Sequence, residues 1–173
     1  MCYNLGMKEI KLTQGKVSLI DDEDFELVSR HKWSTAKRGR TSYAKTNIYL
    51  NKKQVTLLMH TLITGKTQGL EMDHINHNGL DNRRCNLRHV TNIENHYNSR
   101  SRLNHSSIYK GVSWHKPTNK WRGTIGQNGR QYHLGLFTSE KEAALAYNKE
   151  AIKIFGEFAC LNHAPVVTKQ PTD

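Results

Sequence analysis

The stretch EMDHINHNGLDNRRCNLRHVTNIENHYNSR, residues 71–100, decides the fold of the first half of the chain. It opens with a short run that carries Asp73 and His74, crosses a polar loop rich in Asn and Gly, and returns as a second run over Asn86–Val90. Thr91 followed three residues later by Glu94 has the spacing of a capping box, which marks a helix start. The pattern therefore predicts a strand, a loop, a strand and a helix within about thirty residues.

This unit resembles the catalytic unit of the HNH nucleases, a ββα-metal motif, and is similar to phage and intron-encoded members. The resemblance rests on Asp73-His74-Ile75-Asn76 with Asn78, Leu80-Asp81-Asn82-Arg83, Asn86-Leu87-Arg88, and Glu94-Asn95 with Asn98. A set of this size is specific, whereas an Asp-His pair alone is not. It implies an α+β fold and a metal-dependent endonuclease of the nicking or homing type, which hydrolyses phosphodiester bonds in DNA.

Phosphodiester hydrolysis needs an activated water, neutralisation of the phosphate charge and help for the leaving oxygen, and a divalent metal can supply the last two. His74 titrates near neutrality, so it can take a proton from water. Asp73 and Asn95 offer the oxygen ligands that Mg²⁺ prefers. The resemblance implies these same catalytic roles, with Asn86 bracing the loop that orients His74. Ser99 stands where the family often has His, which favours a two-ligand Mg²⁺ or Mn²⁺ site over a zinc site.

The adjacent positions of Asp73 and His74 pose a geometric question. Neighbouring residues on a regular strand point to opposite faces, so both can serve one site only where the strand twists or ends. Asn76 and Gly79 favour a strand end shortly after His74. In the alternative interpretation this segment is only an Asn-rich surface turn, which accounts for fewer of the matching positions.

The formal net charge of +11 and the pI of about 9.7 favour a polyanionic partner. A basic protein of membrane surfaces is the alternative, but no long apolar stretch and no signal peptide is visible. Double-stranded DNA is therefore the expected partner, and no coiled-coil heptads indicate more than a monomer.

The three cysteines are Cys2, Cys85 and Cys160, and they are far apart. The absence of a C-x-x-C pair argues against a zinc ribbon, and the odd count argues against a disulfide framework. Both observations indicate a reducing compartment, the cytoplasm, which is the host cytoplasm for a phage-encoded protein.

Residues 1–58 are expected to form a β-rich N-terminal part of the nuclease domain, followed by the catalytic unit over residues 59–100. Asp21–Ser29 has the pattern of a short helix with acids near its start. Trp33 is expected in the core, and His60 is expected to be packed or hydrogen-bonded rather than catalytic. The predicted strands are Lys8–Leu12, Val17–Ile20, Ser42–Ile48 and Gln54–Met59.

Residues 108–162 show a second pattern, a small three-stranded antiparallel sheet with one packed helix. The predicted strands are Tyr109–His115, Lys120–Gln127 and Arg130–Phe137. Asn128-Gly129 is a strong hairpin signal between the last two strands. Ser139 and Glu142 have capping-box spacing at the start of a helix, and Gly156 is placed to stop it.

This second segment resembles the Apetala2/ERF-type DNA-binding domain. The resemblance rests on YKGVSWHKPTNKWRGTI, YHLGLF, EAALAYNKEA and the closing Gly156 and Leu161-Asn162. It implies that the sheet face away from the helix lies in the DNA major groove. Alternation puts Trp121, Gly123, Ile125 and Leu134 toward the helix. The outward face of the sheet, away from the helix, departs from the plant pattern, which is richer in Arg and Trp, so no base sequence is carried over.

The candidate DNA-binding residues come from both units and from the basic linker between them, residues 101–107. They are Arg83, Arg88, Arg100, Arg102, Lys110, Ser113, His115, Lys120, Arg122, Thr124, Gln131 and His133. The linker arginines are expected to follow phosphates, which adds salt-sensitive affinity without sequence information. Residues 163–173 lack apolar periodicity and are expected to form a disordered tail.

Two alternatives to a DNA endonuclease stay open. The first is a DNA-binding regulator with an inactive nuclease domain, against which the intact set of Asp73, His74, Asn86 and Asn95 argues. The second is an RNA substrate, although no aromatic stacking motif of the single-strand-binding kind stands out. A single nuclease site in a monomer makes nicking of one strand the simplest expectation.

Overall fold

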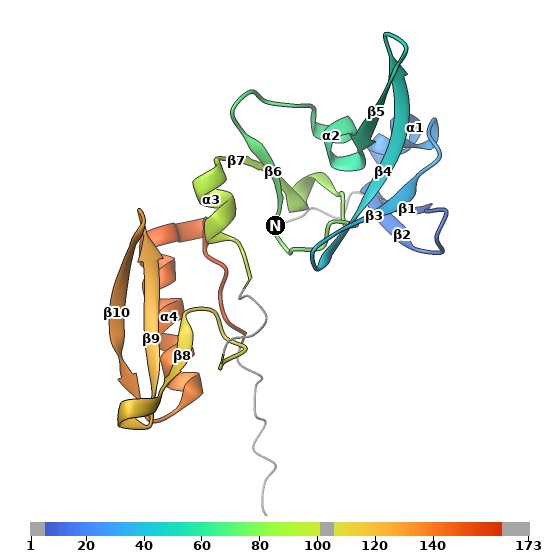
Figure 1. Ribbon diagram of the computed structural model, residues 1–173. Coiled ribbons are helices and arrows are strands. Elements are labelled where there is room, and N and C mark those ends of the chain that lie inside the picture. Colours follow the sequence, from blue (N-terminus) through green and yellow to red (C-terminus); the bar gives the residue numbers. More distant parts are fainter. Residues whose placement is uncertain (1–5, 101–105, 164–173) are drawn as a thin grey trace, which may run out of the picture. The chain divides into compact units, whose positions relative to one another are not determined.

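The computed structural model describes residues 6–100 and 106–163, a mixture of helices and small antiparallel sheets (Figure 1). The chain divides into two compact units, Met1–Asn95 and His96–Asp173. Arg102, most of the predicted linker and the predicted tail from residue 164 onward lie outside the described residues.

The first unit begins with a hairpin and continues into a three-stranded antiparallel sheet. Its elements are β1 (Met7–Lys11), β2 (Val17–Asp21), the 3₁₀ turn η1 (Asp22–Asp24), α1 (Phe25–Ser29), β3 (Ser34–Arg38), β4 (Thr41–Leu50), β5 (Lys53–Leu58) and α2 (Met59–Thr64). The sheet order is β3-β4-β5, and Asn51 and Lys52 take positive φ at the β4–β5 turn. The predicted strands and short helix of this part are thereby confirmed.

The core of the first unit gathers side chains from β1, β2, α1, β4, α2 and β7 (Leu87–Val90). Trp33 is 1% exposed, and its indole N–H donates to the Val28 carbonyl at 2.8 Å. A buried indole needs such a partner for its N–H. The prediction that Trp33 is a core residue is confirmed.

β6 (Glu71–His74) and β7 form a two-stranded antiparallel sheet, and α3 (Asn92–Tyr97) follows β7. The short 3₁₀ turn η2 (Arg84–Asn86) leads into β7. The Thr91 amide donates to the Glu94 carboxylate at 2.7 Å, and the Glu94 amide donates back to the Thr91 hydroxyl at 3.3 Å. The predicted capping box is therefore present, and the strand–loop–strand–helix order is as the sequence indicated.

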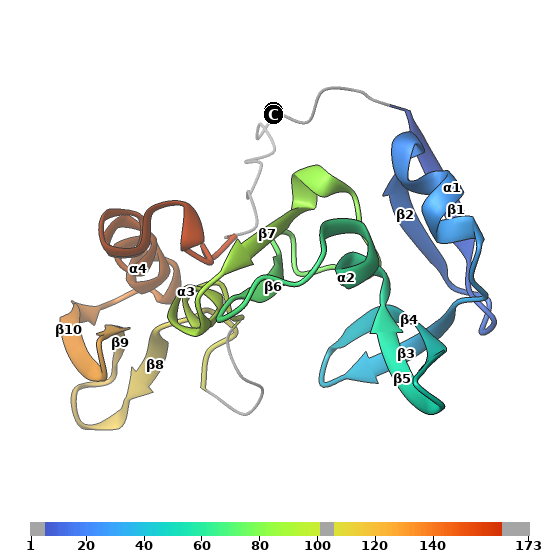
Figure 2. The same cartoon turned by 90° about the horizontal axis from the view of Figure 1, so that it is seen from above.

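The second unit is a three-stranded antiparallel sheet with one long helix across it, as predicted (Figure 2). Its elements are β8 (Val112–His115), the 3₁₀ turn η3 (Lys116–Thr118), β9 (Lys120–Gln127), β10 (Arg130–Phe137), α4 (Glu140–Phe155) and the 3₁₀ turn η4 (Gly156–Phe158). Ser139 and Glu142 form the capping box of α4, and Gly156 ends it with a φ of 54°.

The expected alternation of β9 is confirmed by its burial. Gly123 and Ile125 are buried toward α4, whereas Lys120 and Arg122 are exposed. On β10, Leu134 packs against the cluster of Ile125, Tyr147, Ala151 and Phe155. One face of the sheet therefore supports the helix, and the other carries polar and basic side chains.

The first strand of this sheet is shorter than predicted, because β8 begins at Val112 instead of Tyr109. Gly111 has a φ of 75°, a conformation that interrupts a strand. A Cβ atom at Gly111 would overlap the Tyr147 ring and the Thr124 carbonyl oxygen. The close approach of the chain to α4 at this glycine is what delays the strand.

The cysteines depart from the expectation in one respect. Cys85 is disulfide-bonded, whereas Cys160 forms no disulfide. An odd count of cysteines still permits a disulfide, which was not expected from the sequence. Within the part of the chain that the structure describes, no helix has the length and apolarity needed to cross a membrane.

Candidate functional site

Strand β6 holds Asp73 opposite Arg88 of β7. The Arg88 Nε and Nη2 atoms each lie 2.9 Å from Asp73 Oδ2, and both side chains are largely buried. An ion pair withdrawn from water in this way is costly to break from one side only, because the remaining charge loses its partner. The predicted metal ligand is therefore held in place by a neighbouring cation.

Two residues earlier on the same strand face lies Glu71, which the sequence argument missed. The Asn95 side-chain amide donates to Glu71 Oε2 at 2.6 Å, and that of Asn92 donates to Oε1 at 3.1 Å. These hydrogen bonds lower the pKa of Glu71 and tie α3 to β6. The alternation of Glu71 and Asp73 is a signal from which this carboxylate could have been found.

His74 ends β6 and points to the other face, into the interior of the first unit. It is 5% exposed, and its ring lies edge-on to Tyr43 and His60, with ring centroids 5.6 and 5.1 Å apart. Burial lowers the pKa of His74, while Asn82 and the charges of Asp73 and Asp81 act in the opposite direction. The imidazole is thus neutral near pH 7, and the Asp73 charge is close enough to affect it.

The Nε2 atom of His74 has a defined neighbour. His74 Nε2 lies 3.4 Å from Asn82 Oδ1, and the Nδ2 atom of the fully buried Asn82 donates to the Ser18 hydroxyl at 2.7 Å. Because the Asn82 nitrogen is directed at Ser18, its oxygen faces the imidazole as an acceptor. This arrangement favours the tautomer with the proton on Nε2 and makes Nδ1 the basic nitrogen.

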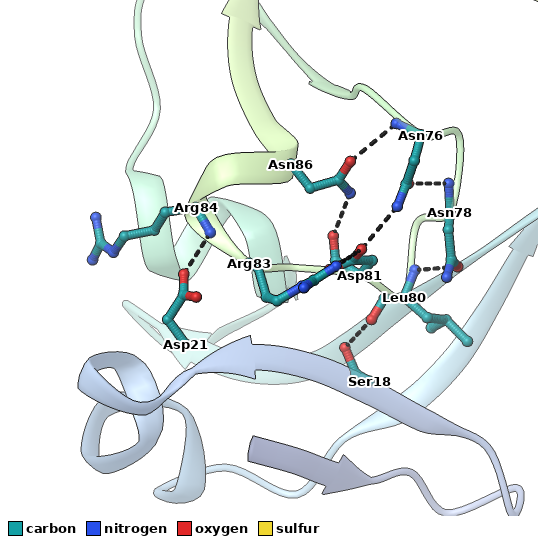
Figure 3. Close-up of polar contacts among 9 residues, drawn as sticks. All are labelled: Ser18, Asp21, Asn76, Asn78, Leu80, Asp81, Arg83, Arg84 and Asn86. Atoms are coloured by element: carbon teal, nitrogen blue, oxygen red, sulfur yellow. Dashed lines mark hydrogen bonds and ion pairs between the residues drawn. The ribbon is translucent and has the colours of Figure 1, made fainter. Parts of the chain in front are cut away.

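The loop after β6 is fixed by its asparagines (Figure 3). Asn86 accepts from the Asn76 amide at 3.0 Å through Oδ1 and donates to the Asp81 carbonyl at 2.7 Å through Nδ2. Asn76 in turn donates to Asp81 Oδ2 at 2.8 Å and accepts from the Asn78 amide at 2.8 Å. Asn86 therefore spans the loop from one side to the other, directly after the strand end at His74.

The same loop is held against the first hairpin and the central sheet. Leu19 donates to the Leu80 carbonyl and accepts from the Asn82 amide, both at 2.8 Å. A Cβ atom on Gly79 would lie 2.6 Å from the Ser42 carbonyl oxygen and from the Tyr43 ring. Glycine is thus required where the loop meets Tyr43, the ring that also contacts His74.

Two arginines of this unit that were predicted to bind DNA already have carboxylate partners. Arg83 donates to Asp81 through Nε and Nη2, both at 2.7 Å, and Arg88 is paired with Asp73 as described. Arg84, which was not predicted as a site residue, pairs with Asp24 at 2.7 Å. Its backbone amide donates to Asp21 Oδ2 at 2.7 Å (Figure 3). These contacts give all three arginines a structural role.

The predicted metal ligands form a hard, oxygen-donating set. Asn95 directs its nitrogen to Glu71, so its amide oxygen is the atom left to act as a ligand, next to the strand that carries Asp73. A carboxylate and an amide oxygen suit Mg²⁺ or Mn²⁺ better than a thiolate-seeking metal. Within the described residues, no three His, Cys, Asp or Glu side chains are grouped to hold a metal ion.

The predicted DNA-binding residues of the second unit divide into two groups. Lys120, Arg122, Gln131 and His133 are exposed on the face away from α4, with Ser113 and Thr124 half-buried beside them. Lys110 differs, because its Nζ atom donates to the Tyr97 carbonyl at 2.6 Å and burial lowers its pKa. His115 contacts Thr118 at 2.8 Å through Nδ1. Arg100 is exposed just after α3.

Comparison with known proteins finds similarity over different parts of the chain. An uncharacterized HNH endonuclease of Acanthamoeba polyphaga mimivirus is 32% identical over 152 residues, 86% of this chain and 76% of that protein. Protein 3.8 of Escherichia phage T7 is 36% identical over 92 residues, 53% of this chain and 75% of that protein. APETALA2-like protein 2 of Oryza sativa subsp. indica is 40% identical over 57 residues, 33% of this chain and 13% of that protein. No protein-family model and no solved structure matches the chain.

Proposed function

The chain belongs to the HNH endonuclease family, and from this premise we propose that it is a metal-dependent endonuclease that hydrolyses phosphodiester bonds in double-stranded DNA. One observation carries the proposal. At adjacent positions β6 presents a carboxylate, Asp73, and a buried neutral imidazole, His74, and the Asn95 amide is tied to the same strand through Glu71. This placement supports the site residues predicted from the sequence.

His74 acts as the general base in this proposal. Burial keeps the imidazole neutral at physiological pH, so it is ready to accept a proton. With Nε2 directed at Asn82, the proton taken from the attacking water goes to Nδ1. Tyr43 and His60 pack edge-on against the ring and limit its rotation.

Asp73 and Asn95 would hold the divalent metal, Mg²⁺ or Mn²⁺, through their side-chain oxygens. When bound, the metal supplies Lewis acidity toward the phosphate and the leaving 3′ oxygen. Arg88 sets the position of Asp73, and Glu71 sets that of Asn95. Asn86 is a positioning residue, because it braces the loop that starts where His74 ends.

The second unit is proposed to bind DNA and to place the nuclease unit on its target. The similarity of 57 residues to APETALA2-like protein 2 supports this role, as do the polar and basic residues on the outer sheet face. The catalytic unit then covers residues 59–100 and the DNA-binding domain residues 108–162. With one nuclease site in each monomer, a nick in one strand is the expected product of a homing-type or site-recognising enzyme.

Cleavage of supercoiled plasmid DNA tests the proposal. The full chain is incubated with Mg²⁺, Mn²⁺ or EDTA, beside the variants His74→Ala and Asp73→Asn. His163→Ala is the control, because this imidazole is exposed at the end of the described residues. We expect metal-dependent conversion to open circles, lost in the first two variants and retained in the control.

DNA binding is measured in parallel for each variant. Loss of cleavage with retained binding assigns the two residues to catalysis. Tight binding without cleavage in any metal, on DNA shown to contain the bound site, would instead identify a DNA-binding regulator with an inactive nuclease domain.

A further inference from the structure

A cavity of about 410 Å³ lies on the outer sheet face of the second unit. Its floor carries Arg122 and Thr124 of β9 and Gln131 of β10, three residues predicted to enter a DNA groove. Its wall is built by the segment that follows Asn95, including His96 and Arg100. The face is therefore concave at this place, which the sequence did not indicate.

Two contacts fix the wall to the sheet unit. The Tyr97 ring stacks on Phe155, with centroids 4.0 Å apart and an interplanar angle of 18°. The Lys110 ammonium donates a hydrogen bond to the Tyr97 carbonyl oxygen at 2.6 Å. Residues 96–100 thus belong to the second compact unit, His96–Asp173.

The lining of the cavity has the chemistry of an anion site. It contains the guanidinium groups of Arg100 and Arg122 and the imidazole of His96, and no Asp or Glu among the described residues lines it. Arg122 has no carboxylate partner among the described residues, and its Nε atom makes only a long hydrogen bond of 3.4 Å to the Ser113 hydroxyl. This guanidinium, unlike those of Arg83 and Arg88, keeps its donors for a ligand.

Neutral donors complete the lining. Gln131 Nε2 donates to Thr124 Oγ1 at 3.3 Å, which orients both side chains at the floor. Guanidinium, hydroxyl and amide donors around a cavity without carboxylates are the groups that bind phosphate oxygens.

We propose that this cavity is a phosphate-binding site that takes one backbone phosphate of a DNA strand, held between Arg100 and Arg122. The inference rests on the proposed DNA-binding role and deepens it. Residues 96–100 become part of the DNA-binding surface, and this part of the sheet face contacts the sugar–phosphate backbone. Such a contact fixes the register of the protein on DNA without reading sequence.

The salt dependence of DNA binding tests this site in EDTA, where no cleavage occurs. Wild type, Arg100→Gln and Arg122→Gln are titrated with a labelled 20-base-pair duplex at several KCl concentrations. Loss of one phosphate contact makes the negative slope of log K against log salt shallower by about 0.9. Lys149 is an exposed residue of α4, on the other side of the sheet. Lys149→Gln removes the same charge there, and the slope of this variant should equal that of wild type.

Titration of the ¹⁵N-labelled full chain with inorganic phosphate and with the duplex identifies the ligand source. We expect the Thr124 and Gln131 signals to shift with the duplex, and much less with phosphate alone. Unchanged slopes in both arginine variants, with DNA binding and cleavage intact, would overturn the cavity assignment and leave the nuclease proposal standing. Shifts with phosphate in a chain that does not bind DNA would overturn both the DNA assignment and the proposed DNA-binding role.

Discussion

The side-chain nitrogen of Asn95 lies 2.6 Å from Glu71 Oε2, so helix α3 is tied to strand β6 beside the candidate metal ligands. Asn92 donates to the second oxygen of the same carboxylate at 3.1 Å. Both hydrogen bonds lower the pKa of Glu71, which keeps the carboxylate ionised. Glu71 therefore selects the amide orientation in which the oxygen of Asn95 can serve as a ligand.

Replacing Glu71 by Leu should lower the affinity for the metal ion while having a smaller effect on the stability of the fold. Without its acceptor the Asn95 amide is free to turn, and groups that orient metal ligands typically contribute 10–100-fold in metal affinity or activity. We expect the Mg²⁺ concentration for half-maximal nicking to rise by about tenfold or more, with much of the rate recovered at high Mg²⁺.

Two further variants separate orientation from charge in this test. Glu71→Gln keeps an oxygen that can accept from Asn95, so its Mg²⁺ dependence should fall between those of wild type and Glu71→Leu. Glu9→Leu removes an exposed carboxylate from β1 and serves as the control. An unchanged Mg²⁺ dependence in Glu71→Leu would show that Glu71 does not orient the ligand.

Gly79→Ala should destabilise the first unit and reduce nicking. Its Cβ atom would lie 2.6 Å from the Ser42 carbonyl oxygen and from the Tyr43 ring, so the loop or the ring must move. Such overpacking typically costs about 1–3 kcal/mol. Because Tyr43 contacts His74, the shift should also displace the general base. Urea unfolding and nicking rates measure the two effects.

The matched control for this prediction is Gly126→Ala. The nearest atom to a Cβ there is the Arg130 carbonyl oxygen at 3.8 Å, an ordinary contact. Its unfolding midpoint and nicking rate should stay near those of wild type. Equal behaviour of the two variants would contradict the role given to the close approach at Gly79.

Features that depend on residues close together in the sequence were predicted correctly, whereas features that depend on distant residues were not. The capping boxes at Thr91 and Ser139 and the alternation along β9 depend on residues a few positions apart, and all three are as expected. The late start of β8 was missed, because the constraint at Gly111 comes from Tyr147, which is distant in sequence.

The candidate site shows the same division. Asp73, His74 and Asn95 were found from a motif, and Glu71 could have been found from strand alternation. The packing of His74 against Tyr43 and His60, and the contact of Asn82 with Ser18, join segments that only the folded chain brings together. The partners of Arg83 and Arg88 were missed for another reason. A sequence shows a basic side chain but not whether a carboxylate already faces it.

The stability of the first unit should fall as the pH is lowered from about 6.5 to about 4. Burial, together with the charges of His74 and Arg38, lowers the pKa of His60 from 6.5 to about 4. A lowered pKa in the folded state means that the unfolded chain binds the proton more tightly. The contribution of His60 to stability is therefore fully present above pH 6.5 and is lost as the pH falls toward 4. The full effect of His60 is about 3 kcal/mol. Urea unfolding at several pH values measures it.

His60→Phe isolates this contribution. A phenyl ring can keep edge-on contacts with Tyr43 and His74 but cannot take up a proton. We expect the variant to lose less stability than wild type between pH 7 and pH 4.5. Part of the dependence should persist, since burial also lowers the pKa of His74. Identical pH profiles for the two proteins would rule out His60 as a source of the acid sensitivity.

Arg88→Gln should destabilise the first unit in a way that Mg²⁺ partly reverses. The Arg88 guanidinium lies 2.9 Å from Asp73 Oδ2, and removing one partner of a buried ion pair typically costs about 3–5 kcal/mol. A cation held by Asp73 and Asn95 would restore positive charge beside the stranded carboxylate. We therefore expect Mg²⁺ to raise the Tm of Arg88→Gln by more than it raises the Tm of wild type.

The double variant Asp73→Asn/Arg88→Gln completes a thermodynamic cycle for this pair. It leaves no unpaired charge, so its Tm should exceed that of Arg88→Gln, and Mg²⁺ should no longer shift it because the proposed ligand has been removed. A Mg²⁺ shift that persists in the double variant would place the cation elsewhere in the chain. If Mg²⁺ shifts the Tm of wild type and Arg88→Gln equally, the cation does not share Asp73 with Arg88.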